Sequence, residues 1–142
     1  MQRSSFSKYK GQNIIIYIIF LLYITSVFFL CFFNPSKIGV ELTKHFLGIP
    51  LDKILHFILF FPFPITFYFV MEYTPILNQI KYRLCIGLLL GCIISLLTEL
   101  IQYYFIAGRQ GDWLDYIADI IGLSIATILM WIYTIVKKSA SK

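Results

Sequence analysis

The stretch TELIQYYFIAGRQGDWLDYIADIIG, Thr98–Gly122, decides how the rest of this 142-residue chain is interpreted. It joins the end of one apolar run to the start of another through a short polar turn. Glu99 and Gln102 are three residues apart, and Asp115 and Asp119 are four apart, so each pair lies on one face of a helix. A carboxylate at bilayer depth costs about 2.5–3.5 kcal/mol. Glu99 therefore needs a partner or a function.

The composition places the chain in the membrane. Hydrophobic residues make up 59% of it and charged residues 13%, about half the charge of a typical globular protein. We expect an all-α polytopic membrane protein with a single domain, 1–142. The net charge of +5 does not indicate a nucleic-acid partner, because the basic residues lie at the chain ends and in short loops rather than in one stripe. The three cysteines lie within apolar runs and have no disulfide or metal-ligand spacing.

Four segments are long enough to cross about 30 Å of hydrocarbon at 1.5 Å per residue. An N-terminal signal peptide is a weaker interpretation of the first, which is too long and lacks a small-residue cleavage site. Pro62 and Pro64 predict a kink near Ile58 and Phe60 in the second. Before it, Val40–Leu47 is expected to form a helical turn. The four predicted segments are Asn13–Phe33, Ile54–Met71, Leu84–Ala107 and Trp113–Val136.

Basic residues predict the orientation. With four spans, both termini and the loop between the second and third spans lie on one side, and that side carries eight lysines and arginines against four on the other. We therefore expect both termini in the cytoplasm and the polar turn facing outward. The eight are Arg3, Lys8, Lys10, Lys81, Arg83, Lys137, Lys138 and Lys142, and the four are Lys37, Lys44, Lys53 and Arg109.

Polar residues of three helices are expected to converge at the outward end. Glu99 lies about 12 Å and Asp119 about 9 Å inside their helix ends, at 1.5 Å per residue. Small residues at four-residue spacing lie on the same helix faces as Glu99 and Asp119, and such residues let membrane helices approach closely. They are Gly87, Gly91 and Ser95 before Glu99, and Gly122 and Ala126 after Asp119. The predicted site comprises nine residues, namely Asp52, Lys53, His56, Glu99, Gln102, Arg109, Asp112, Asp115 and Asp119.

Structural roles compete with a site at several of these positions. Asp52 after Pro50 is a candidate N-cap, and Asp112 with Asp115 resembles a capping pair. His56 needs a hydrogen-bond partner at its depth, for which Glu99 is a candidate. The whole cluster is also interpretable as a salt-bridge network that only fastens the helices.

Four motifs in order resemble the VanZ-like family of small bacterial membrane proteins. They are D-K-x-x-H-F at Asp52–Phe57, E-x-x-Q at Glu99–Gln102, R-x-x-D-x-x-D at Arg109–Asp115 and A-[ND]-x-x-G at Ala118–Gly122, within a core of about 51–126. Asp119 stands where many members have asparagine. The family is named after a protein linked to resistance to the glycopeptide teicoplanin, so the resemblance implies the bacterial plasma membrane and a role at the envelope; it implies no settled reaction.

Three functions are compatible with these residues. The first is a membrane enzyme in which Glu99 or His56 is the acid or base and Arg109 with Lys53 holds an anionic head group. The second is a binder that holds or masks a membrane lipid or lipid-linked cell-wall precursor through the same cations. The third, ion movement, is disfavoured because the inner halves of the helices carry no charge.

No nucleophile motif accompanies the site, so an enzyme would have to use water. We expect no metal and no cofactor, although His56, Glu99, Asp115 and Asp119 together would suit a hard ion. The residues therefore predict what the first two functions share, an outward-facing polar site for an anionic envelope ligand. In this site Glu99 and His56 are the candidate acid and base, and the candidate binding residues are Asp52, Lys53, Gln102, Arg109, Asp112, Asp115 and Asp119.

Overall fold

The computed structural model describes residues 3–32, 45, 46, 48–72, 79–106 and 112–140. Within them, four helical segments are long and apolar enough to cross a membrane. The all-α polytopic architecture that the composition predicts is therefore confirmed. The helices are α1 (Arg3–Phe32), α2 (Leu51–Phe60) followed by α3 (Pro62–Glu72), α4 (Ile80–Phe105) and α5 (Trp113–Ala140), and the strands in the same residues are β1 (His45–Phe46) and β2 (Ile49–Pro50).

The observed helices are longer than the apolar runs that predict them. The second span begins at Leu51 rather than Ile54, the third at Ile80 rather than Leu84, and the fourth continues to Ala140. An α-helix continues through polar residues as long as its backbone hydrogen bonds are made, whereas hydropathy detects only the part that matches hydrocarbon. The predicted end of the third span, Ala107, lies outside the described residues.

The proline pair interrupts the second span, as the sequence predicts. Phe61 separates α2 from α3, keeps helical dihedrals (φ −55°, ψ −43°) and donates its N–H to the carbonyl of Phe57 at 2.9 Å. Pro62 and Pro64 have no N–H to continue this pattern. Beside the break, the hydroxyl of Tyr23 in α1 donates a hydrogen bond of 2.5 Å to the carbonyl of Leu59.

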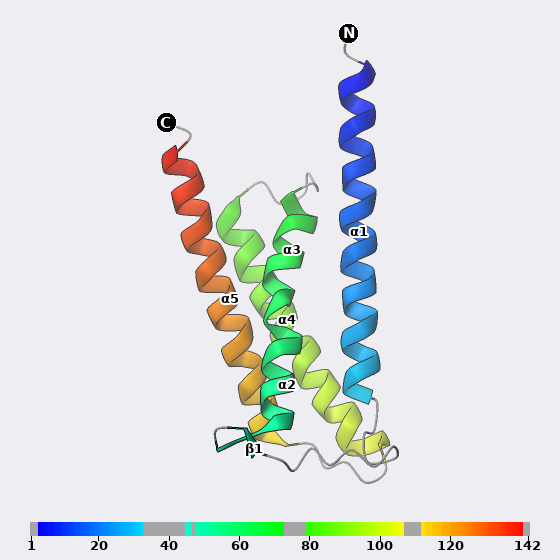
Figure 1. Ribbon diagram of the computed structural model, residues 1–142, viewed down its shortest axis with the longest axis vertical. Helices are drawn as coiled ribbons and strands as arrows, with labels where there is room; N and C mark the ends of the chain where they lie inside the picture. The colour runs from blue at the N-terminus through cyan, green and yellow to red at the C-terminus, as the bar shows by residue number, and fades with distance from the viewer. Residues whose placement is uncertain (1–2, 33–44, 47, 73–78, 107–111, 141–142) are drawn as a thin grey trace.

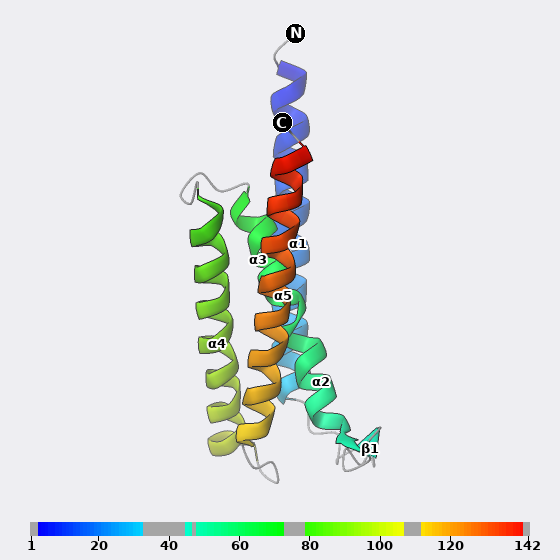
Figure 2. The same cartoon turned by 90° about the vertical axis from the view of Figure 1, so that its left-hand side faces the viewer.

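The start of α1 and the end of α5 lie at one end of the bundle, and the start of α2, the end of α4 and the start of α5 lie at the other (Figure 1). Figure 2 shows α5 between α4 on one side and α2 on the other, and α5 packs against both helices. The core beneath the polar end consists of Val27, Cys31, Phe60, Phe63, Phe67 and Leu123.

Small residues allow the close helix contacts, which confirms the ridges predicted on α4 and α5. A Cβ atom on Gly122 would lie 2.8 Å from the backbone oxygen of Phe57, and one on Gly91 would lie 2.5 Å from Cδ2 of Leu123. Along α4 and α5 the same faces are buried at Ser95 and Ala126. Helices in lipid pack most closely where side chains are smallest, so these positions fix how near α2 and α4 come to α5.

A short antiparallel hairpin precedes α2, with His45 opposite Pro50 and Phe46 opposite Ile49. Gly48 between the strands has φ of +80°, a conformation that glycine adopts without a steric penalty. The helical turn predicted over Val40–Leu47 is wrong at His45 and Phe46; the other residues of that range lie outside the described part of the chain.

Candidate functional site

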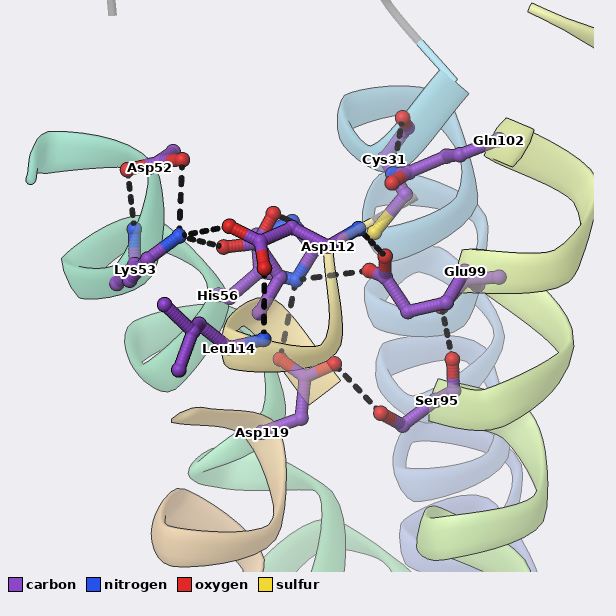
Figure 3. Close-up of polar contacts among 12 residues, drawn as sticks. Cys31, Asp52, Lys53, His56, Ser95, Glu99, Gln102, Asp112, Leu114 and Asp119 are labelled. Carbon is purple, nitrogen blue, oxygen red and sulfur yellow. Dashed lines mark hydrogen bonds and ion pairs between the residues drawn. The ribbon is translucent and has the colours of Figure 1, made fainter. Parts of the chain in front are cut away.

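The polar residues gather where α2 and α5 begin and α4 ends, at the end of the bundle away from the termini. Figure 3 shows the side chains of Lys53, His56, Glu99, Asp112 and Asp119 directed toward one another from these elements. The convergence predicted from helical spacing is thus observed for the residues that the structure describes. Five of the seven acidic residues of the chain are in this assembly, which divides into a lysine cluster (Asp52, Lys53, Asp112, Asp115) and a histidine cluster (His56, Ser95, Glu99, Asp119).

In the lysine cluster, one ammonium group is surrounded by three carboxylates. Lys53 Nζ lies 2.7 Å from Oδ2 of Asp112, 2.8 Å from Oδ1 of Asp115 and 3.3 Å from Oδ2 of Asp52. An ammonium group has three N–H donors, so these contacts use its full capacity. The Lys53 side chain is 15% exposed. Lys53 therefore joins α2 to α5 and has no donor left for an anionic ligand in this arrangement.

Asp112 caps α5 and completes the lysine cluster. Its Oδ1 accepts the N–H of Leu114 at 2.9 Å, the contact expected of an N-cap residue. The hydrogen bond from Lys53 lowers the pKa of the Asp112 carboxyl, and the bond from the Leu114 N–H acts in the same direction. The capping pair predicted with Asp115 is correct for Asp112 only, because Asp115 binds Lys53 and the N–H of Asp112 is donated to Oε2 of Glu99 at 3.3 Å.

Asp52 is not the N-cap of α2. That position is Pro50, which makes no side-chain cap hydrogen bond. Asp52 lies in the first turn, where its Oδ1 accepts the N–H of Lys53 at 3.0 Å. A carboxylate in the first helical turn satisfies a free N–H and complements the helix dipole. Asp52 therefore stabilises the start of α2, as an N-cap would, from a position two residues after the cap.

The histidine cluster lies one helical turn deeper. His56 is 2% exposed and Asp119 is fully buried. Nδ1 of His56 lies 3.1 Å from Oδ1 of Asp119 and 3.6 Å from Oε1 of Glu99, while Nε2 lies 3.9 Å from Oδ2 of Asp115. The hydroxyl of Ser95 donates to Oδ2 of Asp119 at 2.5 Å. The hydrogen-bond partner of His56 is thus Asp119, and the predicted partner Glu99 is the second-nearest carboxylate.

Glu99 connects the histidine cluster to the start of α5. It is 7% exposed, and its two carboxylate oxygens differ: Oε2 accepts the N–H of Asp112, whereas Oε1 is buried with no hydrogen-bond partner. Buried polar atoms are nearly always hydrogen-bonded, and the exceptions need an explanation. The residue singled out by the sequence is therefore also the least satisfied polar residue of the described site.

Two predicted site residues differ from the others. Gln102 is buried, but its amide donates to the carbonyl of Cys31 in α1 at 2.8 Å, so it fastens α1 to α4 in this structure. Arg109 lies outside the described residues. Of the nine predicted residues, the structure therefore brings seven together around Lys53 and His56: Asp52, Lys53, His56, Glu99, Asp112, Asp115 and Asp119.

A cavity of about 290 Å³ opens beside the histidine cluster, between the end of α4 and the start of α5. We call it the aromatic groove. Three of its aromatic side chains are more than 60% exposed, namely Tyr103, Tyr104 and Trp113, and two carboxylate residues line its polar side. The residues lining the groove are Leu96, Glu99, Leu100, Tyr103, Tyr104, Asp112, Trp113 and Tyr116.

The sequence did not predict the groove or the role of Ser95. A tryptophan at the start of a span, such as Trp113, is typical of the membrane interface, and Ser95 is a small residue four positions before Glu99. Neither pattern specifies which carboxylate the serine binds or that four aromatic residues share one cavity. Both depend on the rotation of α4 relative to α5.

Fold and site together define a four-span membrane protein with a buried histidine–carboxylate cluster next to an aromatic groove. No protein-family model, curated protein or solved structure matches this chain.

Proposed function

We propose that this chain is a VanZ-like protein of the bacterial plasma membrane that binds the head group of an envelope lipid or lipid-linked cell-wall precursor in the aromatic groove. The observation that carries the proposal is that Glu99 and Asp112 line the same cavity as Tyr103, Tyr104 and Trp113. Ligand sites are concave, mostly apolar and equipped with a few polar groups. A groove of this kind at the end of a membrane bundle suits a ligand that is part lipid and part polar.

The described contacts favour hydrogen-bond donors on the ligand. Lys53 is occupied by three carboxylates, and the charged groups that line the groove are acceptors, Glu99 and Asp112. Sugar hydroxyls and amines donate to carboxylates, and aromatic rings offer flat apolar faces beside them. We therefore propose a glycan- or amine-bearing head group. An anionic group of the same ligand is assigned to Arg109 on sequence grounds.

The proposed role is envelope homeostasis or tolerance of teicoplanin-type glycopeptides. The basic residues predict that both termini are cytoplasmic, and the polar end is opposite the start of α1 and the end of α5 (Figure 1). The groove would then face outward, where cell-wall precursors are exposed to such drugs. A protein that holds a cell-wall precursor in the groove would reduce the access of the drug to that precursor.

Binding of a defined probe tests this function. The full chain in detergent is titrated with undecaprenyl-linked disaccharide-pentapeptide and, separately, with phosphatidylglycerol, and bound mass is measured by native mass spectrometry. We expect the glycan-bearing lipid to bind and Trp113→Ala to weaken it at least tenfold. The matched control is Trp131→Ala, an exposed tryptophan of the same helix outside the groove. Equal binding of both lipids, or equal loss in both variants, would contradict the proposal.

A second function is favoured by one observation: His56 lies between Asp119 and the free Oε1 of Glu99, and Glu99 also lines the groove. A histidine held by a carboxylate beside a second carboxylate is suited to proton transfer to a bound ligand. If the protein is an enzyme, Glu99→Gln abolishes product formation from the bound lipid and leaves its binding within about threefold of wild type. If the protein is a binder, neither wild type nor Glu99→Gln forms a product, and protection from the drug follows the affinity for the lipid.

A further inference from the structure

The histidine cluster has the composition of a metal site. Unlike the lysine cluster, it contains no lysine or arginine side chain among the described residues. His56, Glu99 and Asp119 each offer one ligand atom within 4.8 Å of the others, and so do Asp52, Asp112 and Asp115. The second set surrounds the ammonium group of Lys53. Within the described residues, the first set has only the imidazole of His56 between its two buried carboxylates. Two buried carboxylates beside one imidazole leave negative charge without compensation.

We propose that His56, Glu99 and Asp119 bind a divalent metal ion through Nδ1, Oε1 and Oδ1. Oε1 of Glu99 is buried and has no hydrogen-bond partner, and it points at His56 in Figure 3. One imidazole with two carboxylates suits ions between the hard and the borderline class, such as Mn²⁺ and Zn²⁺. This proposal does not require the lipid ligand proposed above, although Glu99 lines the groove as well.

The two distances from His56 to the carboxylates are close to those of neighbouring metal ligands, and all three ligand atoms lie within 4.8 Å of one another. Metal bonds to nitrogen and carboxylate oxygen of about 2.0–2.2 Å place neighbouring ligand atoms about 3 to 3.5 Å apart. Nδ1 of His56 lies 3.1 Å from Oδ1 of Asp119 and 3.6 Å from Oε1 of Glu99. An ion therefore requires side-chain movements and not a change of fold.

The remaining oxygen of each carboxylate ligand already has a hydrogen-bond partner, and the second nitrogen of His56 faces a carboxylate beyond hydrogen-bond distance. Oδ2 of Asp119 accepts from Ser95, and Oε2 of Glu99 accepts the N–H of Asp112. Nε2 of His56 faces Oδ2 of Asp115 at 3.9 Å. In metal centres the second nitrogen of a histidine usually donates to a carboxylate, and ligating carboxylates are themselves hydrogen-bonded. These contacts leave Nδ1, Oε1 and Oδ1 as the atoms directed inward.

Glu99 connects the proposed metal site to the aromatic groove. His56 and Asp119 are buried, but Glu99 lines the aromatic groove. An ion would therefore enter past Glu99, and three protein ligands leave coordination positions for water or a ligand group, as in catalytic rather than closed structural sites.

Metal titration of the full chain tests the proposal. Detergent-purified, chelator-treated protein is titrated with Mn²⁺ and followed by electron paramagnetic resonance, and Zn²⁺ is tested as a competitor. We expect one saturable ion per chain and a ¹⁴N modulation in the electron spin echo of bound Mn²⁺, lost in His56→Gln. Glu99→Gln and Asp119→Asn should weaken binding at least tenfold, and Ser95→Ala about tenfold through its hydrogen bond.

The matched control is Asp52→Asn, which removes a carboxylate from the lysine cluster alone and should bind Mn²⁺ as wild type does. Thermal melts establish that each variant is folded. If a variant of a metal ligand does not fold, Ser95→Ala still tests the site, because it removes only a hydrogen bond to Asp119. Absence of saturable binding to wild type, an unchanged affinity in Glu99→Gln, or binding without the nitrogen signal would overturn the proposal. Lipid binding is measured separately, so failure of this site leaves the proposed function untouched.

Discussion

At the scale of single residues, Lys53 has the largest predicted effect on stability. Lys53→Met removes the cation shared by Asp52, Asp112 and Asp115, of which Asp115 is only 8% exposed. Leaving a buried carboxylate unpaired destabilises proteins by about 3–5 kcal/mol, and the partial exposure of the other two reduces this to about 2–3 kcal/mol. Thermal or denaturant unfolding in detergent measures the change.

Lys137→Met is the matched control for this prediction. Lys137 forms an ion pair of 3.3 Å with Glu72 at the opposite end of the bundle, and its side chain is 55% exposed. Exposed ion pairs contribute little to stability, so the control should melt close to wild type. Similar losses in both variants would show that the lysine cluster is no more than a surface interaction.

The ion pair of Asp112 with Lys53 makes the stability of the lysine cluster depend on pH in the acidic range. Because the hydrogen bond from Lys53 lowers the folded pKa of Asp112, the stabilisation is complete above the ordinary aspartate pKa of about 3.9 and is lost as the pH falls through the lowered value. Asp112→Asn keeps a capping oxygen for Leu114 but has no charge to lose. The stability difference between wild type and variant, measured from pH 7 to pH 3, should therefore shrink below about pH 4. A difference that is constant over this range would contradict the assigned ion pair.

At the scale of helices, Gly122 controls how closely α5 approaches α2. A Cβ there would lie 2.8 Å from the oxygen of Phe57 and 3.4 Å from the nitrogen of Phe61, and backbone atoms cannot rotate away. We expect Gly122→Ala to force the helices apart and lower the unfolding free energy by about 1–3 kcal/mol. The control is Ser124→Ala, which also introduces alanine but lies two residues further along α5. It should change the unfolding free energy by less than half as much. Equal effects would show that the contact is not tight.

Sequence patterns predict the buried faces of these helices but not their pairwise contacts. Three- and four-residue spacing places Glu99 with Ser95, and Asp115 with Asp119, whatever the helices pack against. The partner of His56 is Asp119 rather than Glu99 because of the rotation of α2 about its axis, which no spacing within one helix encodes. The contact of Gln102 with α1 is equally hidden in the sequence: α1 is apolar along its span, so nothing there marks the carbonyl of Cys31 as an acceptor.

At the scale of the whole molecule, the orientation in the membrane is the prediction that places the site. Phe46 is 60% exposed at the polar end, and Lys138 is exposed at the end of α5. In a background with Cys31, Cys85 and Cys92 replaced by alanine, Phe46→Cys should react with an impermeant maleimide on intact cells. Lys138→Cys should react only after permeabilisation. The reverse pattern would place the groove in the cytoplasm and exclude a role for it in shielding external precursors.

The most direct test of a functional polar end is protection from teicoplanin in a sensitive Gram-positive host. Wild type, Glu99→Gln and Lys137→Met are compared at matched membrane levels and with matched melting temperatures. We predict that wild type and Lys137→Met raise the inhibitory concentration and Glu99→Gln does not, because only Glu99 belongs to both the histidine cluster and the groove. Equal protection by all three would show that the buried carboxylate only fastens helices, and no protection by wild type would contradict the envelope role.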